Sequence, residues 1–170
     1  MSRSFKVLIA GAFNAGKSEF VRTASQIPVV STERRISDDL AEVKEETTVA
    51  MDYGQATVRG DLFHLFGTPG QSRFDFMWDI LGRDSDALLV LVDSTDRSTL
   101  TTARRLLRQL RRKSKIPFLV VATKQDGRRP MTPDEIASGL KIEATSVVAC
   151  DARQKESVIA VLSHLSTLLR

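Results

Sequence analysis

A glycine-containing segment near the start of the sequence has the residue types and spacing that phosphate binding requires. Gly11 and Gly16 bracket four residues, Lys17 and Ser18 follow directly, and the segment stands between an apolar run and a helical pattern. The glycines let the backbone curl so that several N–H groups point at one phosphate, and the next helix adds a partial positive charge. Lys17 can neutralise the outer phosphates, and the Ser18 hydroxyl can ligate magnesium. Unless the glycine loop is a coincidence, the sequence predicts a nucleotide site of the P-loop type.

A second segment, residues 123–126, stands at the end of an apolar strand and predicts which base is bound. The Asp126 carboxylate can accept two parallel hydrogen bonds from N1–H and the exocyclic amine of guanine, whereas adenine offers no such pair of donors. The Lys124 stem can lie along the base and the ribose. Alone, such a run is usually a solvated turn, but behind a phosphate loop it favours a guanine site.

Together with three further motifs, these two segments resemble the Ras-like small GTPases, and the resemblance covers nearly the whole chain. Five motifs occur in the family's order: residues 11–18, Thr48, Gly70-Gln71, residues 123–126 and residues 150–153. Segments 47–54 and 65–71 look most like prokaryotic members related to MglA and to the GTPases encoded beside Roadblock-family proteins. The resemblance implies a switch, in which loops around Thr48 and Gln71 are ordered by the γ-phosphate and magnesium and released after hydrolysis.

The resemblance also implies a role for each matched residue. Ser18 and Thr48 would ligate Mg²⁺, Gln71 would orient the attacking water, and Lys17 would assist catalysis by neutralising charge. The Gly70 amide would sense the γ-phosphate. The implied nucleotide-binding set is Asn14, Ala15, Gly16, Lys17, Ser18, Glu19, Thr48, Gly70, Lys124, Asp126 and Ala152, with the Ala152 N–H meeting the guanine O6.

Three positions depart from the family's pattern. The family's usual Asp at the start of the second switch holds a magnesium-bound water and is Gly67 here; Asp52 on the neighbouring strand could replace it, or could face solvent. Pro69 stiffens the loop before Gln71, which affects hydrolysis more than binding. Thr123 replaces the usual Asn, so it keeps a hydrogen bond to the P-loop with one fewer group.

Two groups of basic residues could have a function or could simply be solvated surface charge. Arg34 and Arg35 could place an arginine beside the transferred phosphoryl group, or could be solvated loop charge. A basic stripe at helical spacing could be a solvated face, or could contact an acidic partner or an anionic membrane surface. Its members are Arg104, Arg105, Arg108, Arg111, Arg112 and Lys115.

These residues need elements that bring distant loops together. Strands are predicted over residues 5–10, 48–53, 62–66, 87–93, 117–123 and 146–150, and a turn at 59–61 is predicted to join the second and third of them as an antiparallel hairpin. Helices are predicted from the P-loop to about residue 26, around the apolar stripe Phe74, Met77, Trp78 and Leu81, and over 99–113, 133–139 and 154–169. Residues 27–46 are predicted to form a long loop with one helical turn. The predicted fold is a three-layer α/β P-loop domain over residues 1–170, Ras-like by resemblance, with a mostly parallel six-stranded sheet and one antiparallel edge strand.

Composition narrows the class of protein further. A chain of 170 residues with 42% apolar content can form one soluble domain without disulfides, and the single Cys150 is expected to pack in the core. His64 and His164 lack metal-ligand spacing, and a net charge of +4 is too mild to indicate nucleic acid. Because no membrane span, signal peptide or common lipid-anchor motif occurs, a cytoplasmic protein is expected, with peripheral membrane contact only.

Three functional hypotheses follow. The first is a molecular switch that binds GTP and GDP with Mg²⁺ and hydrolyses GTP slowly, assisted by a Roadblock-family or other regulatory partner. The second is a GTP- or GDP-binding scaffold with little hydrolysis, which Gly67 and Pro69 favour. The third is an ATP-using P-loop enzyme such as a small kinase, against which Asp126 and the lack of an evident acceptor lid both argue.

Overall fold

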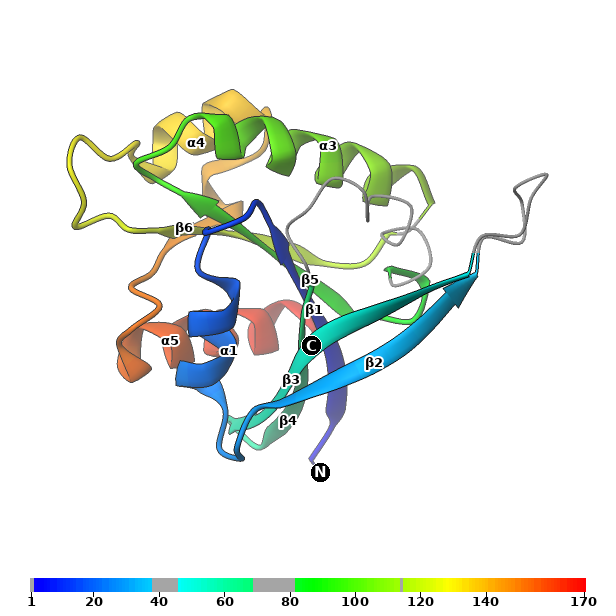
Figure 1. The fold of residues 1–170 in the computed structure, drawn as a ribbon. Coiled ribbons are helices and arrows are strands. Elements are labelled where there is room, and N and C mark those ends of the chain that lie inside the picture. Colours follow the sequence, from blue (N-terminus) through cyan, green and yellow to red (C-terminus); the bar gives the residue numbers. More distant parts are fainter. Residues whose placement is uncertain (1, 38–45, 69–81, 114) are drawn as a thin grey trace.

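Apolar strands alternate with helices along the chain and form one central sheet covered on both faces (Figure 1). The computed structural model describes residues 2–37, 46–68, 82–113 and 115–170, without the side chains of 32–37, 46–49, 112 and 113. The strands are β1 (Ser4–Gly11), β2 (Val30–Ser37), β3 (Glu46–Val58), β4 (Asp61–Gly67), β5 (Ala87–Asp93), β6 (Phe118–Thr123) and β7 (Val147–Ala149). The helices are α1 (Lys17–Ala24), α3 (Ser98–Lys113), α4 (Pro133–Leu140), α5 (Lys155–Leu168) and the short 3-10 helix η2 (Ala144–Ser146).

The sheet is mostly parallel, as predicted. Its strand order within the described residues is β2-β3-β4-β1-β5-β6-β7, and all neighbours from β4 to β7 pair in parallel. Strand β3 is antiparallel to both of its neighbours. Every residue of β5 is buried, because a parallel strand inside a three-layer fold has helices over both faces. Parallel strands end at one edge of a sheet, so the loops after β1, β5, β6 and β7 lie near one another there.

The number of strands was underpredicted, because residues 30–37 form β2 and not the predicted loop. This strand pairs with β3 in continuous register from Val30 opposite Tyr53 to Ser37 opposite Glu46. Its sequence, VSTERRIS, lacks the apolar alternation by which a half-buried strand is recognised. An edge strand can be held by its backbone hydrogen bonds, and charged residues there discourage pairing with other chains.

The predicted hairpin between β3 and β4 is confirmed. Arg59 and Gly60 form the connection, with φ values of 54° and 82°. Two consecutive left-handed residues match the twist of a two-residue hairpin, and such a turn favours glycine at its second position. The strands are longer than predicted and extend the pairing from Val58 opposite Asp61 to Asp52 opposite Gly67.

Two apolar clusters hold the three layers together. Leu88, Val90 and Val92 of β5 pack towards α3 and α4, whereas Leu89 and Leu91 pack towards α1 and α5. Figure 1 shows these two helix pairs on opposite sides of the sheet. The second cluster includes Cys150, which is buried as predicted.

Five of the six residues of the predicted basic stripe lie on α3, whereas Lys115 lies beyond the end of this helix. Arg104, Arg105, Arg108 and Arg111 are exposed there, and Arg104 donates a hydrogen bond of 3.0 Å to the Gly139 carbonyl of α4. The Arg111 guanidinium lies over the Phe118 ring at 5.1 Å. In the described part of the chain, no helix is both long and apolar enough to cross a membrane.

Candidate nucleotide-binding site

The loop between β1 and α1 is a curled backbone cradle whose shape depends on glycine. Gly11 has a φ of 147°, and a Cβ atom there would lie 2.5 Å from the Leu91 carbonyl oxygen of β5. Gly16 is the N-cap of α1 with a φ of 101°, and Asn14 is also left-handed. Because Gly16 has no side chain to bond the first N–H groups of α1, these groups remain open to an anion.

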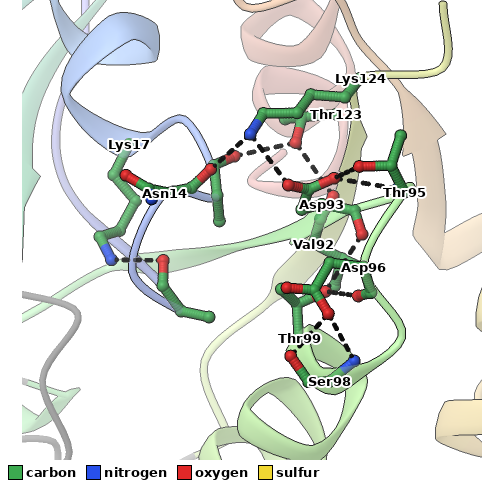
Figure 2. Close-up of polar contacts among 12 residues, drawn as sticks. Asn14, Lys17, Val92, Asp93, Thr95, Asp96, Ser98, Thr99, Thr123 and Lys124 are labelled. Atoms are coloured by element: carbon green, nitrogen blue, oxygen red, sulfur yellow. Dashed lines mark hydrogen bonds and ion pairs between the residues drawn. The ribbon is translucent and has the colours of Figure 1, made fainter. Parts of the chain in front are cut away.

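Lys17 lies folded against this cradle. Its Nζ donates hydrogen bonds to the carbonyls of Gly11 and Ala12, the latter at 3.0 Å, and Figure 2 shows the side chain turned back towards the loop. The residue is only 9% exposed, and burial lowers the pKa of Lys17 to about 8. No described carboxylate forms an ion pair with it. A phosphate in the cradle would supply the missing negative charge and raise that pKa again.

Next to the cradle, a hydroxyl and a carboxylate meet. Ser18 Oγ donates a hydrogen bond of 2.8 Å to Asp52 Oδ2. Asp52 is half-buried on β3 and pairs in register with Gly67 at the end of β4. All three residues line a cavity of about 610 Å³ that also includes Lys17. Of the two positions left open for Asp52, the structure shows its carboxylate beside the cradle, in contact with the Ser18 hydroxyl.

A second cavity, of about 750 Å³, lies where the loops after β6 and β7 approach the P-loop. Thr123, Lys124, Asp126 and Ala152 are among the residues that line it. Gly16, Glu19 and Lys124 line both cavities, so the two cavities adjoin along the P-loop and are together called the cleft. Ala15 itself is fully buried, and its N–H donates a hydrogen bond of 3.1 Å to the Ala12 carbonyl.

Thr123 and Lys124, at the end of β6, form hydrogen bonds with the P-loop. Thr123 Oγ1 lies 2.8 Å from the Ala15 carbonyl and 3.0 Å from the Val92 carbonyl, which confirms the predicted link to the P-loop. Lys124 Nζ donates to the Asn14 carbonyl at 2.8 Å, and Figure 2 shows this side chain crossing the gap between the loop and β5.

Asp93 is a residue of this region that the sequence did not single out. It ends β5, and its carboxylate accepts hydrogen bonds from Lys124 Nζ at 2.9 Å and from the Thr95 hydroxyl at 2.6 Å (Figure 2). Burial works to raise the pKa of Asp93, but the Thr95 and Lys124 contacts together bring it below its ordinary value. A polar residue at the C-terminal end of a buried parallel strand was the signal that could have found it.

Asp126 and the loop after β7 both line the second cavity. Asp126 Oδ2 accepts a hydrogen bond of 2.6 Å from Arg153 Nη2. Arg153 also binds Asp151, the residue before Ala152. The P-loop is adjacent, because a Cβ atom at Gly16 would lie 3.8 Å from the Ala152 Cβ.

Several predicted site residues cannot be placed in this way. Thr48 lies in β3 opposite Arg35 of β2, but the side chains of both, and that of Arg34, lie outside the described residues. Gln71, Gly70 and Pro69 also lie outside the described residues, as do Phe74, Met77, Trp78 and Leu81.

Other predicted residues are placed more simply. Glu19 is half-buried on α1 and pairs with Arg22 at 2.7 Å. The His64 ring forms hydrogen bonds with the hydroxyl groups of Tyr53 and Ser4. The described His, Cys, Asp and Glu residues include no group of three that could hold a metal ion.

Comparison with known proteins gives a match over the whole chain. Residues 1–169 match the model of the ADP-ribosylation factor family. Human ADP-ribosylation factor-like protein 5A is 27% identical over 173 residues, which cover 97% of this chain and 89% of that protein. ADP-ribosylation factor-like protein 3 of Chlamydomonas reinhardtii is 26% identical over 88% of this chain and 81% of its own length. An uncharacterized protein of Methanocaldococcus jannaschii is 28% identical over 122 residues, 71% of this chain and 70% of that protein.

Proposed function

The chain belongs to the ADP-ribosylation factor family of small GTPases, and on that premise we propose that it is a switch that binds GTP and GDP with Mg²⁺ and hydrolyses GTP slowly. The observation that carries the proposal is that the two cavities adjoin along the P-loop. A phosphate cradle at one end and a guanine-type carboxylate at the other share Gly16, Glu19 and Lys124 as walls. A nucleoside phosphate has its anionic and base ends in this same order.

At the phosphate end, backbone N–H groups from Asn14 to Ser18 would hold the phosphates. Lys17 would leave the carbonyls of Gly11 and Ala12 and donate to the outer phosphates. Its charge is well suited to this role, because it is buried without a described counter-ion and gains one only when an anion enters. The same charge would stabilise the transferred phosphoryl group.

Mg²⁺ fits the oxygen groups beside the cradle, since this metal prefers hydroxyl, carboxylate and phosphate oxygens. When bound, it would neutralise charge on the phosphates. Ser18 and Thr48 would hold it, and the Asp52 carboxylate would support it in place of the family's usual Asp. A Cβ atom at Gly67 would lie 3.5 Å from the Asp52 Cβ, so a carboxylate from either strand would start from nearly the same point.

At the base end, Asp126 would accept the two guanine donors and the Ala152 N–H would meet O6. Lys124 would lie along the base and ribose while Asp93 and the Asn14 carbonyl hold its ammonium group. Thr123 would keep the base loop at a fixed distance from the P-loop. Adenine lacks the matching donors, so the site would discriminate against ATP.

Several finer assignments stay predictions within this proposal. They are the water-orienting role of Gln71, the γ-phosphate contact of Gly70, an arginine role for Arg34 or Arg35, and the single-domain extent of residues 1–170. The relation to the MglA and Roadblock-associated branch, a Roadblock-family partner, a cytoplasmic location and membrane contact through α3 are likewise predictions. A scaffold without hydrolysis is the alternative, because Pro69 stiffens the loop before Gln71.

The proposal is tested by isothermal titration of the nucleotide-free protein with GDP, GTP and ATP in Mg²⁺. We expect binding of GDP and GTP but not ATP, and a loss of at least about a hundredfold in Asp126→Ala, which removes two charge-assisted hydrogen bonds. Asp134→Ala is the matched control, because Asp134 is an exposed carboxylate on α4 that lines neither cavity. Equal ATP binding, or no binding at all, would refute the proposed site.

Hydrolysis needs a separate measurement. Single-turnover release of phosphate from bound GTP distinguishes the switch from the scaffold, and Gln71→Ala is the variant that should slow it. A rate no different from that of free GTP, both alone and with a candidate partner, would favour the scaffold.

A further inference from the structure

The predicted guanine acceptor forms an ion pair with a cation from the same chain. Arg153 Nη2 lies 2.6 Å from Asp126 Oδ2, across the cavity that Asp126, Ala152 and Lys124 line. The two residues belong to different loops, one after β6 and one after β7. The contact therefore bridges the two walls between which the base would enter.

Arg153 is held in this position by a second carboxylate. Its Nε lies 2.9 Å from Asp151 Oδ1, and its Nη2 lies 3.0 Å from Asp151 Oδ2. The Arg153 backbone N–H also donates to Asp151 Oδ1 at 3.0 Å. Such a two-pronged contact fixes the plane of a guanidinium group, so the second N–H of Nη2 is directed at Asp126.

Guanine recognition needs the acceptor that Arg153 uses. The N1–H and the exocyclic amine of guanine require both oxygens of one carboxylate, and Asp126 Oδ2 is already engaged. We propose that Arg153 is an internal competitor of guanine for Asp126, which lowers the affinity of this site for guanine nucleotides. This inference rests on the proposed function, because it names a residue that sets the affinity of that same site.

The size of the effect follows from exposure. The side chains of Arg153 and Asp126 are 61% and 63% exposed, so water and salt screen their ion pair. Exposed ion pairs of this kind shift an equilibrium by about two- to fivefold. Removing the competitor should tighten guanine binding by that factor. If Arg153 instead held the bound base, its removal would weaken binding.

The test compares two variants that lose the same charge. Arg153→Gln removes the competitor, and Arg129→Gln is the control, because Arg129 is exposed on the Asp126 loop and lines neither cavity. Titration with a fluorescent GDP at low ionic strength should give a Kd about two- to fivefold lower for Arg153→Gln and an unchanged Kd for Arg129→Gln. At about 1 M salt the difference between Arg153→Gln and the wild type should disappear, because the ion pair is screened.

A Kd for Arg153→Gln that equals or exceeds the wild-type value at low salt would overturn the inference while leaving the proposed function intact. An equal tightening in Arg129→Gln would also overturn it, because general charge and not the contact would be responsible. Failure of the wild type to bind GDP would refute the proposed function and the inference together. Thermal melting of both variants checks that they are folded, and Arg153→Lys, which keeps the charge without the fork, should give an intermediate Kd.

Discussion

Asp52→Asn should weaken the magnesium dependence of nucleotide binding without weakening phosphate binding itself. The substitution keeps the shape of the side chain and an acceptor for the Ser18 hydroxyl, which now lies 2.8 Å from Asp52 Oδ2. It removes the described carboxylate that contacts this hydroxyl. Substitution of a residue that supports a metal ligand in this way typically lowers metal affinity by about 10- to 100-fold, or roughly 1.4 to 2.7 kcal/mol.

The assay is the dissociation rate of a fluorescent GDP measured across a range of free Mg²⁺ concentrations. We expect the Mg²⁺ concentration at half-effect to rise by about 10- to 100-fold in Asp52→Asn. In excess EDTA we expect GDP to dissociate from Asp52→Asn at the wild-type rate or more slowly, because without the metal the Asp52 carboxylate only repels the phosphates. This result separates a metal role from general damage to the site.

A paired substitution sharpens the test. Exchanging the two residues, with Asp52→Gly and Gly67→Asp, moves the carboxylate to the neighbouring strand, where a Cβ atom would lie 3.5 Å from the present Asp52 Cβ. It would also lie 3.2 Å from Val21 Cγ2, so a small adjustment is needed. The exchange should recover part of the lost Mg²⁺ affinity. An unchanged half-effect concentration in Asp52→Asn would refute the metal role of this residue.

Three further predictions concern the loops that frame the cleft. Gly11→Ala should destabilise the fold by about 1–3 kcal/mol or more, because its Cβ atom would meet the Leu91 carbonyl at a φ of 147°; an unchanged melting temperature would contradict this. Thr123→Val should cost about 1–3 kcal/mol, because the buried carbonyl of Ala15 loses its donor, and denaturant unfolding measures the loss. The nucleotide-free protein should gain stability as pH rises from about 8 towards 10.5, because burial lowers the pKa of Lys17 to about 8 and the unfolded chain then binds more protons. Lys17→Met should lack this gain, and equal pH profiles for the two proteins would exclude Lys17 as its source.

The sequence was sufficient where the signal is local. The P-loop glycines, the apolar runs of β1, β5 and β6, and the Arg59-Gly60 turn each follow from conformational preferences within a few residues. Strand β2 was missed because its pairing with β3 is made by backbone groups, and the sequence VSTERRIS carries little apolar periodicity.

The missed site residues have a common reason. Asp93 is tied to Lys124, 31 positions away, and Arg153 to Asp126, 27 positions away. Each pair forms only because parallel strands deliver their loops to one edge of the sheet. Such contacts are determined by strand order, which a single sequence indicates only through a recognised motif. Motif residues such as Lys124 and Asp126 were therefore predicted, whereas the charged residues that bind them were not.

The position of Asp52 changes how binding and switching are connected in this chain. In the family's usual pattern, the carboxylate that supports the metal stands at the start of the same loop that carries Gly70 and Gln71. In our proposal this carboxylate is Asp52 of β3, where the ladder with β4 runs from Val58 opposite Asp61 to Asp52 opposite Gly67. A regular strand holds a side chain more firmly than a loop does, and movement after Pro69 need not displace this carboxylate. We therefore expect Mg²⁺-dependent binding of GDP to be unaffected by Gln71→Ala, so that the switch and the scaffold hypotheses differ only in the hydrolysis step.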